Sequence, residues 1–177
     1  EVPQLARIII SIDPAVTANT DSDMTGIVVA GIDVNGIAYV LEDHTDRYTP
    51  QQWASKAIEL YRKHMADRIV AEKNQGGDMV RHTLHTEDEN VPVKLVHASR
   101  GKMARAEPVS ALYEQGKVKH VRGLNDLEDQ MVQWEPLGST GSPDRLDAMV
   151  WAITDLSLNG YAKPQLVLAY SNAKGLK

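Results

Sequence analysis

Four acidic side chains stand at positions where a carboxylate can take part in chemistry. Asp13 ends an apolar, β-branched run that is typical of an interior strand, and Glu72 ends the similar run RIVAE. Asp144 and Asp147 lie in the first turns of the helix predicted for SPDRLDAMVWAITDL. An ionised acid buried without a partner is costly, so a cation, a proton or solvent must compensate each of these charges.

Divalent metal binding is the chemistry that these acids favour. Parallel neighbouring strands end at the same edge of a sheet, so we expect Asp13 and Glu72 to lie together. Two acids in a dry cleft repel each other unless they share a proton or bind a cation. The chain has no cysteine and no histidine pair at ligand spacing, which favours Mg²⁺ or Mn²⁺. Two such ions about 4 Å apart can activate water and stabilise the leaving oxygen in phosphodiester hydrolysis.

Each acid also has a simpler interpretation. Asp13 precedes Pro14 and can start a turn, and Glu72 can be a solvated strand end. Asp144 and Asp147 lie where the helix dipole favours acids, so a solvated helix face is as compatible with them as a ligand pair. Both are expected to point away from the apolar stripe of Leu146, Met149 and Ile153.

The elements that must position these acids follow from hydrophobic periodicity. Strands are predicted over residues 7–13, 25–32, 36–43, 68–74 and 92–98, with a short strand or edge segment at 118–121. Helices are predicted from Thr49-Pro50, over about 79–85, 102–115 and 124–134, and from Ser142-Pro143. Asn35-Gly36 favours a tight hairpin turn. We therefore expect an α/β fold whose mixed sheet is antiparallel in its first three strands, then parallel, and is flanked by helices.

Composition restricts the classes of protein that remain. The 177 residues suit a single domain, with a core over about 7–158 and a C-terminal tail over 159–177. The net charge of -5 argues against a protein that coats nucleic acid, although it allows a local basic groove. Without cysteine, disulfides, thiolate zinc sites and cysteine nucleophiles are excluded. No apolar segment approaches the roughly 20 residues that span a bilayer, so no membrane partner is expected. The start at EVPQ suggests a piece of a longer protein that lacks a neighbouring domain.

Five segments, in order along the chain, resemble one protein family. IDPA, DMTGIVVAG, AEKNQGGDMV, KMARAEP and SPDRLDAMVWAITDL resemble the C-terminal nuclease domain of large terminase subunits from tailed bacteriophages and related gene-transfer particles. The resemblance covers about residues 8–156. Its most specific parts are E-x-N-x-G-G after a strand and S-P-D-R-x-D-A at a helix start. It implies a ribonuclease-H-like fold and an endonuclease that cuts double-stranded DNA during genome packaging with two Mg²⁺ or Mn²⁺ ions.

The resemblance assigns roles to all four acids. Asp13 matches the acid of the family's first strand, Glu72 that of the fourth strand and Asp144 that of the final helix. Asp147 matches a further acid found in the related Holliday-junction resolvases. All four are therefore expected to be catalytic and metal-binding, and which of Asp144 and Asp147 is the main ligand stays open.

The resemblance also implies partners. These are an N-terminal ATPase motor domain of the same protein, the portal protein and the small terminase subunit, with the host cell cytoplasm as the place of assembly. The Walker pattern G-x-x-x-x-G-K-[ST] does not occur, so this chain should not hydrolyse ATP.

Four basic residues are candidates for contacts with DNA phosphates. Lys102 and Arg105 lie one helical turn apart, Arg100 stands beside them and Lys73 adjoins Glu72. Ordinary solvated charges are an equally good interpretation, and Lys73 could instead screen the acids. Contacts to the backbone alone would make cleavage tolerant of sequence.

Three alternatives remain open at this stage. A Holliday-junction resolvase of the same fold would be expected to dimerise and to prefer branched DNA. A non-catalytic module could dock on the portal or the motor and keep the acids as relics. A nucleotide-binding protein of the actin-like group is expected to have a glycine-rich phosphate loop after its first strand, and VTANTDSD has no glycine.

Overall fold

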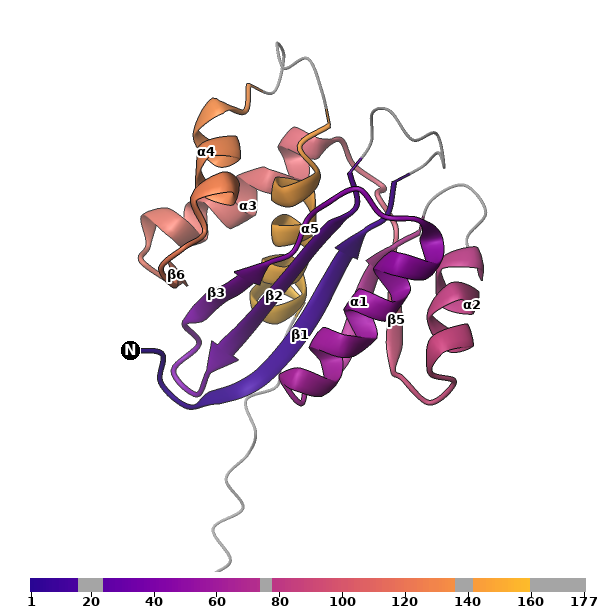
Figure 1. Ribbon diagram of the computed structural model, residues 1–177. Coiled ribbons are helices and arrows are strands. Elements are labelled where there is room, and N and C mark those ends of the chain that lie inside the picture. Colours follow the sequence, from indigo (N-terminus) through magenta and orange to yellow (C-terminus); the bar gives the residue numbers. More distant parts are fainter. Residues whose placement is uncertain (16–23, 74–77, 136–141, 160–177) are drawn as a thin grey trace, which may run out of the picture.

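A mixed β-sheet forms the centre of the computed structural model, which describes residues 1–15, 24–73, 78–135 and 142–159 (Figure 1). Within these ranges the strands are β1 (Leu5–Asp13), β2 (Gly26–Asp33), β3 (Ala38–Asp43), β4 (Arg68–Glu72), β5 (Val93–Val96) and β6 (Val118–His120). Their order across the sheet is β5-β4-β1-β2-β3-β6. β1, β2 and β3 are antiparallel neighbours, β4 and β5 run parallel to β1, and β6 runs parallel to β3. The expected mixed sheet is confirmed.

The turn between β2 and β3 forms as the sequence predicts. Gly36 adopts a φ of 84°, a conformation that costs glycine little because it has no Cβ. The Asp33 carboxylate accepts hydrogen bonds from the backbone N–H groups of Asn35 and Ile37, each at 2.9 Å. The hairpin therefore fixes the register of β2 against β3 locally.

Helices cover both faces of the sheet (Figure 1). One face carries α1 (Pro50–Lys63) and α2 (Asp78–Glu87). The other carries α5 (Asp144–Ile153), with α3 (Lys102–Glu114) and α4 (Asn125–Gln133) packed against it, and the π-helical turn η1 (Thr154–Leu158) continues α5. No helix within the described ranges is both long enough and apolar enough to cross a membrane.

The starts of α1 and α5 differ in how well the sequence predicted them. α1 begins with the predicted cap, in which Thr49 and Gln52 form a reciprocal capping box. α5 begins one residue later than predicted, because Pro143 and not Ser142 occupies the N-cap position and no side chain caps the helix. Asp144 is therefore its first residue.

Alternation along the strands separates two apolar layers. Ile10 and Ile12 pack on the side of α1 and α2. Ile9 and Val70 point to the opposite side, where they pack with Ala152 of α5 and with η1. Nine of the ten residues of α5 are buried, so this helix lies in the interior between the sheet and the outer helices.

Candidate active site

Strand pairing places Asp13 beside Glu72. Ile12 of β1 pairs with Ala71 of β4 in parallel register, so the next residue of each strand ends at the same edge of the sheet. Successive side chains alternate between faces, and Asp13 therefore shares the face of Ile9 while Glu72 shares that of Val70. The two acids therefore lie at the same edge, as the parallel strands predicted, and both point toward the α5 side.

The first turn of α5 brings the other two acids to this edge. Asp144 is 7% exposed and Asp147 is 5% exposed. Gly26 is the cross-strand partner of Asp13, and a Cβ built on it would lie 2.2 Å from the Asp144 carbonyl oxygen. Only a glycine lets the helix backbone approach β2 this closely. The solvated helix face considered for Asp144 and Asp147 is wrong, because both side chains are buried.

The four acids share one negative field. The pKa of Asp13 is raised to about 8, first by burial and then by the charges of Glu72, Asp147 and Asp144, with Lys102 opposing them. Burial also raises the pKa of Asp144 and of Asp147, although each accepts a hydrogen bond, from Ser142 and from Lys102 respectively. Burial and mutual repulsion of the acids therefore outweigh the positive charge that lies near them.

Two of the predicted DNA-binding cations lie among the acids. Lys102 Nζ lies 2.6 Å from Asp147 Oδ2 and 3.2 Å from Ser142 Oγ. Arg105 Nη1 lies 3.5 Å from Glu72 Oε2, and its Nη2 lies 3.9 Å from Asp147 Oδ1. The Arg105 side chain is 11% exposed, and its Nε and Nη1 have no hydrogen-bond partner among the described residues. Arg105 is thus an interior cation of the site.

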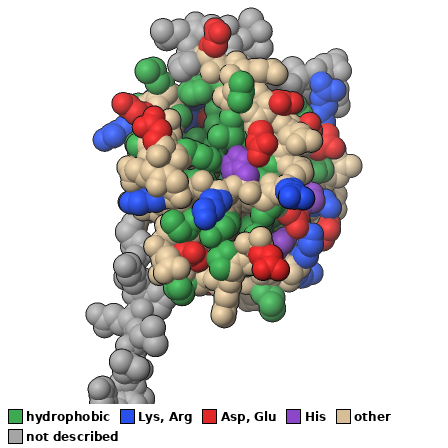
Figure 2. All heavy atoms as spheres, turned by 90° about the vertical axis from the view of Figure 1, so that its left-hand side faces the viewer, with side chains coloured by type: hydrophobic (Ala, Val, Ile, Leu, Met, Phe, Trp, Pro, Cys, Tyr) green, Lys and Arg blue, Asp and Glu red, His purple; other side chains and the backbone are tan. Residues whose placement is uncertain are grey.

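The other two predicted DNA-binding residues, Lys73 and Arg100, are exposed. Phosphate contact by any of the four cations stays a prediction. Figure 2 shows acids and cations interspersed over the face that carries β3, β6, α3 and α4, so no continuous basic stripe marks a DNA path on that face.

Sequence reasoning missed Trp151. Its indole Nε1 donates a hydrogen bond to Glu72 Oε2 at 2.6 Å, and the Arg105 guanidinium lies 4.8 Å from the centre of its ring. The available signal was spacing, since residue 151 follows Asp147 by four positions and Asp144 by seven, which places all three on one helix face.

Sequence reasoning also missed the anchor of α5 to β3. Arg145 Nη1 lies 2.5 Å from Asp43 Oδ2, and both side chains are largely buried. Arg145 Nη2 lies 3.5 Å from the exposed Asp126 of α4. This arginine belongs to the S-P-D-R-x-D-A segment, so a structural role for it was open to inference, but its partner was not.

The donor set fits a hard divalent cation. Within the described ranges, no three acidic or histidine side chains are gathered closely enough to hold a metal ion as they stand. The acids nevertheless offer carboxylate oxygens, the ligands that Mg²⁺ and Mn²⁺ prefer, and the pKa of Asp13 is raised first by burial and then by the negative charges of the other three acids. Lys102 and Arg105 offset part of this negative charge. Metal binding therefore requires the acids to exchange these pairings for the ion.

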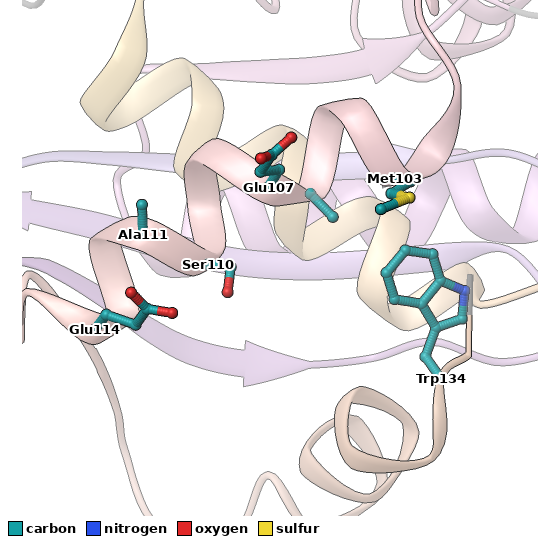
Figure 3. Close-up of a pocket in the computed structure, with 7 residues that line it drawn as sticks. Met103, Glu107, Ser110, Ala111, Glu114 and Trp134 are labelled. Carbon is teal, nitrogen blue, oxygen red and sulfur yellow. The ribbon is translucent and has the colours of Figure 1, made fainter. Parts of the chain in front are cut away.

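A hollow of about 380 Å³ lies along α3 (Figure 3). Met103, Glu107, Ser110 and Trp134 are among the residues that line it, and none of the four acids does. The hollow is therefore not the candidate active site.

Comparison with known proteins finds structures with this fold. The large terminase nuclease from thermophilic phage G20c with bound magnesium has a TM-score of 0.65 at 13% identity, over 84% of this chain and 80% of that one. The nuclease domain of the large terminase subunit gp2 of bacterial virus Sf6 has a TM-score of 0.62 at 13% identity, over 85% and 89%. RuvC of T. thermophilus in complex with a Holliday junction substrate has a TM-score of 0.52 at 15% identity, over 86% and 94%. The G20c nuclease is also known with bound zinc and with bound cobalt.

The structural likenesses show a ribonuclease-H-like fold, and the search of curated proteins finds no match. Of the E-x-N-x-G-G segment, residues 74–77 lie outside the described part of the chain. The family model of the terminase RNaseH-like domain spans residues 10–156, which include all four acids. The chain therefore belongs to the terminase RNaseH-like domain family.

Proposed function

We propose that this chain is the metal-dependent endonuclease domain of a large terminase subunit, which cuts concatemeric double-stranded DNA during genome packaging. The observation that carries the proposal is the convergence of Asp13, Glu72, Asp144 and Asp147, from two strands and one helix, in a buried site short of positive charge. Membership of the family and the nuclease folds of the similar structures support it.

In this proposal the four acids hold two divalent ions, Mg²⁺ or Mn²⁺. The bound ions would supply a water nucleophile at neutral pH and would neutralise charge on the phosphate. The magnesium, zinc and cobalt forms of the G20c nuclease support the use of divalent ions. The protein's own contribution is to hold the acids at the ends of β1 and β4 and in the first turn of α5.

Lys102 and Arg105 have two tasks in the same scheme. In the free protein they offset the charge of Asp147 and Glu72. When the acids bind cations, their ammonium and guanidinium groups become available to phosphate oxygens, which accept such donors without regard to base sequence. Cleavage should then tolerate sequence.

The proposed setting follows from the family and not from the site. It comprises an N-terminal ATPase motor domain of the same protein, the portal protein and the small terminase subunit, in the cytoplasm of the host cell. Membership of the terminase RNaseH-like domain family supports this setting.

Cleavage of linear and plasmid DNA by the purified chain in MnCl₂ tests the proposal. We expect Asp13→Asn to lower the cleavage rate by about 100-fold or more, because a group that stabilises developing charge is lost. Asp129→Asn, an exposed acid on α4, should cleave like the wild type. Equal rates for the wild type and Asp13→Asn would contradict the proposal.

A binding measurement separates weak activity from a missing site. At a Mg²⁺ concentration ten times its Kd, we expect the wild type to gain about 1.4 kcal/mol, or about 3–6 °C in Tm, over the protein in EDTA. Asp13→Asn should gain much less. If neither Mg²⁺ nor Mn²⁺ raised the wild-type Tm, the proposed site would be wrong.

The likeness to RuvC makes a junction resolvase the second candidate. A four-way junction and a linear duplex of the same sequences, mixed in one reaction, distinguish the two. Equal or faster cleavage of the duplex is expected for a terminase nuclease, whereas cutting confined to the junction would favour the resolvase.

A further inference from the structure

We propose that Trp151 is a positioning residue, whose indole N–H fixes the Glu72 carboxylate for a cation and whose ring seats Arg105. The inference rests on the proposed function, because Glu72 acts there as a metal ligand.

The contact to Glu72 is a strong one. The indole Nε1 lies 2.6 Å from Glu72 Oε2, and hydrogen bonds to a charged acceptor are shorter and stronger than neutral ones. Trp151 is 8% exposed, so water competes little for the carboxylate. Glutamate has a long side chain with several rotamers, and β4 ends at Glu72 itself. Trp151 therefore supplies an orientation that the strand alone does not.

The contacts of Glu72 fall on one oxygen only. Trp151 Nε1 and Arg105 Nη1 both approach Oε2. Within the described ranges no hydrogen bond or ion pair reaches Oε1. A carboxylate held by one oxygen presents the other in a fixed direction, which is the arrangement by which outer partners orient metal-binding acids.

The position of Trp151 links two elements of the site, α5 and β4. It lies on α5, on the helix face of Asp144 and Asp147, and bonds to the acid of β4. α5 thereby sets the place of three of the four acids. A shift of this helix would move Glu72 together with its own two aspartates.

The ring of Trp151 holds Arg105 of α3. The guanidinium lies 4.8 Å from the ring centre, whereas its nitrogens lie 3.5 and 3.9 Å from the acids, which is beyond good hydrogen-bond distance. Its buried Nε and Nη1 have no hydrogen-bond partner among the described residues. Stacking on Trp151 thus keeps Arg105 at the site with N–H groups free for a phosphate oxygen.

Mn²⁺ binding to the DNA-free protein, followed by electron paramagnetic resonance, tests the inference. Trp151→Phe keeps an aromatic ring but loses the N–H, and we expect it to raise the Kd for Mn²⁺ about 10-fold, as outer partners of metal ligands do. Trp151→Leu loses the ring as well, and we expect it also to raise the KM for DNA, whereas Trp151→Phe should change KM little.

Trp53→Phe is the matched control. Trp53 is 5% exposed and packs in the core on the opposite face of the sheet. Trp53→Phe should lose about as much stability as Trp151→Phe, while its Kd for Mn²⁺ stays at the wild-type value. If the wild type binds Mn²⁺ and Trp151→Phe binds it with the same Kd, the inference about Trp151 is overturned and the proposed function is not. Absence of binding by the wild type would overturn the proposed function and this inference with it.

A second measurement uses the wild-type Trp151, so it does not depend on whether a Trp151 variant folds. The indole N–H signal of Trp151 in the wild-type NMR spectrum, assigned by elimination with Trp53→Phe and Trp134→Phe, should shift when Mg²⁺ is added and should shift in Glu72→Gln. The Trp53 signal should stay in place in both cases. A Trp151 signal that shifts neither on addition of Mg²⁺ nor in Glu72→Gln would contradict the proposed contact.

Discussion

Asp147 shows what burial does to single charges in this site. Lys102 donates a hydrogen bond to it and Arg105 lies nearby, and both lower its pKa, yet the pKa is raised overall because burial outweighs them. A buried carboxylate with a raised pKa is stabilised in its ionised form by any cation that approaches it more closely than a lysine ammonium group can. Under the proposed function, Lys102 therefore competes with a metal ion for Asp147.

Replacing Lys102 tests this competition. We expect Lys102→Met to bind Mn²⁺ about 2- to 5-fold more tightly than the wild type in the absence of DNA, because the pair with Asp147 no longer has to break. The gain is small because the Lys102 side chain is 42% exposed, and exposed ion pairs contribute at most about 1 kcal/mol. Calorimetric titration measures it.

Lys117→Met, which removes an exposed lysine before β6, is the control for the change of net charge. It should leave the Kd for Mn²⁺ within error of the wild type. Weaker binding by Lys102→Met would show instead that Lys102 organises the acids.

At the scale of elements, the site depends on how α5 lies on the sheet. Close approach at Gly26 and the buried pair of Arg145 with Asp43 hold the start of the helix against β2 and β3. Ala148 allows the same approach from the helix side, since its Cβ would lie 2.9 Å from a Cβ on Gly26. Small residues thus let the backbone bring Asp144 to Asp13.

Gly26→Ala should therefore disturb stability and metal binding together. The added methyl would meet the Asp144 carbonyl oxygen at 2.2 Å, and backbone cannot yield as a flexible side chain can. We expect a loss of about 1–3 kcal/mol in the free energy of unfolding, the usual cost of overpacking, and a higher Kd for Mn²⁺. Urea unfolding and metal titration measure the two effects.

Gly101→Ala provides the comparison, because a Cβ at Gly101 meets nothing within 4 Å and its φ is -60°. Its stability should change by no more than about 0.5 kcal/mol. If Gly26→Ala were as stable as Gly101→Ala, α5 would not lie where the structure places it.

At the scale of the whole molecule, ion pairs far from the acids tie the layers together. Glu42 at the end of β3 lies 2.8 Å from Lys63 Nζ and 3.0 Å from His64 Nε2, both at the end of α1, and 2.7 Å from His44 Nε2. Asp155 of η1 binds Arg68 of β4 in the same way on the other face. Such contacts make stability depend on pH.

Glu42 should contribute to acid sensitivity. Burial would raise its pKa, but hydrogen bonds from Lys63 and His44 outweigh burial and lower the pKa from 4.5 to about 2. The unfolded chain therefore binds this proton first as pH falls, so the stabilisation is complete above about pH 4.5 and is lost toward pH 2. Glu42→Gln should cost roughly 1 kcal/mol at pH 7, allowing for solvent screening, and the cost should shrink as pH falls through about 2.

Urea unfolding of both proteins across this pH range measures the difference. Glu114→Gln, an exposed glutamate at the end of α3, should follow the wild type at every pH. A constant difference between Glu42→Gln and the wild type from pH 7 to pH 2 would contradict the assignment.

Local features of the fold were predictable because their causes are local. The turn at Asn35-Gly36 needs only two residues, and the cap at Thr49 needs the next turn of helix. The proximity of Asp13 and Glu72 followed from a rule about parallel strands, which needs no side-chain contact. The helix start at Ser142 was misplaced by one residue, because serine and proline are favoured at neighbouring cap positions. Strand starts were misplaced as well, since β1 begins at Leu5 and β3 at Ala38 instead of residues 7 and 36.

Periodicity, turn residues and strand ends are written along the chain, so they predicted the succession of strands and helices, the mixed sheet and the four candidate acids. The burial of Asp144 and Asp147, the place of Arg105 inside the site and the bond from Trp151 to Glu72 came only from the packing of the folded chain. Trp151 and Glu72 are 79 positions apart, and Arg145 and Asp43 are 102 apart. Contacts over such separations depend on how closely a helix packs on a sheet, which no local pattern of residues specifies.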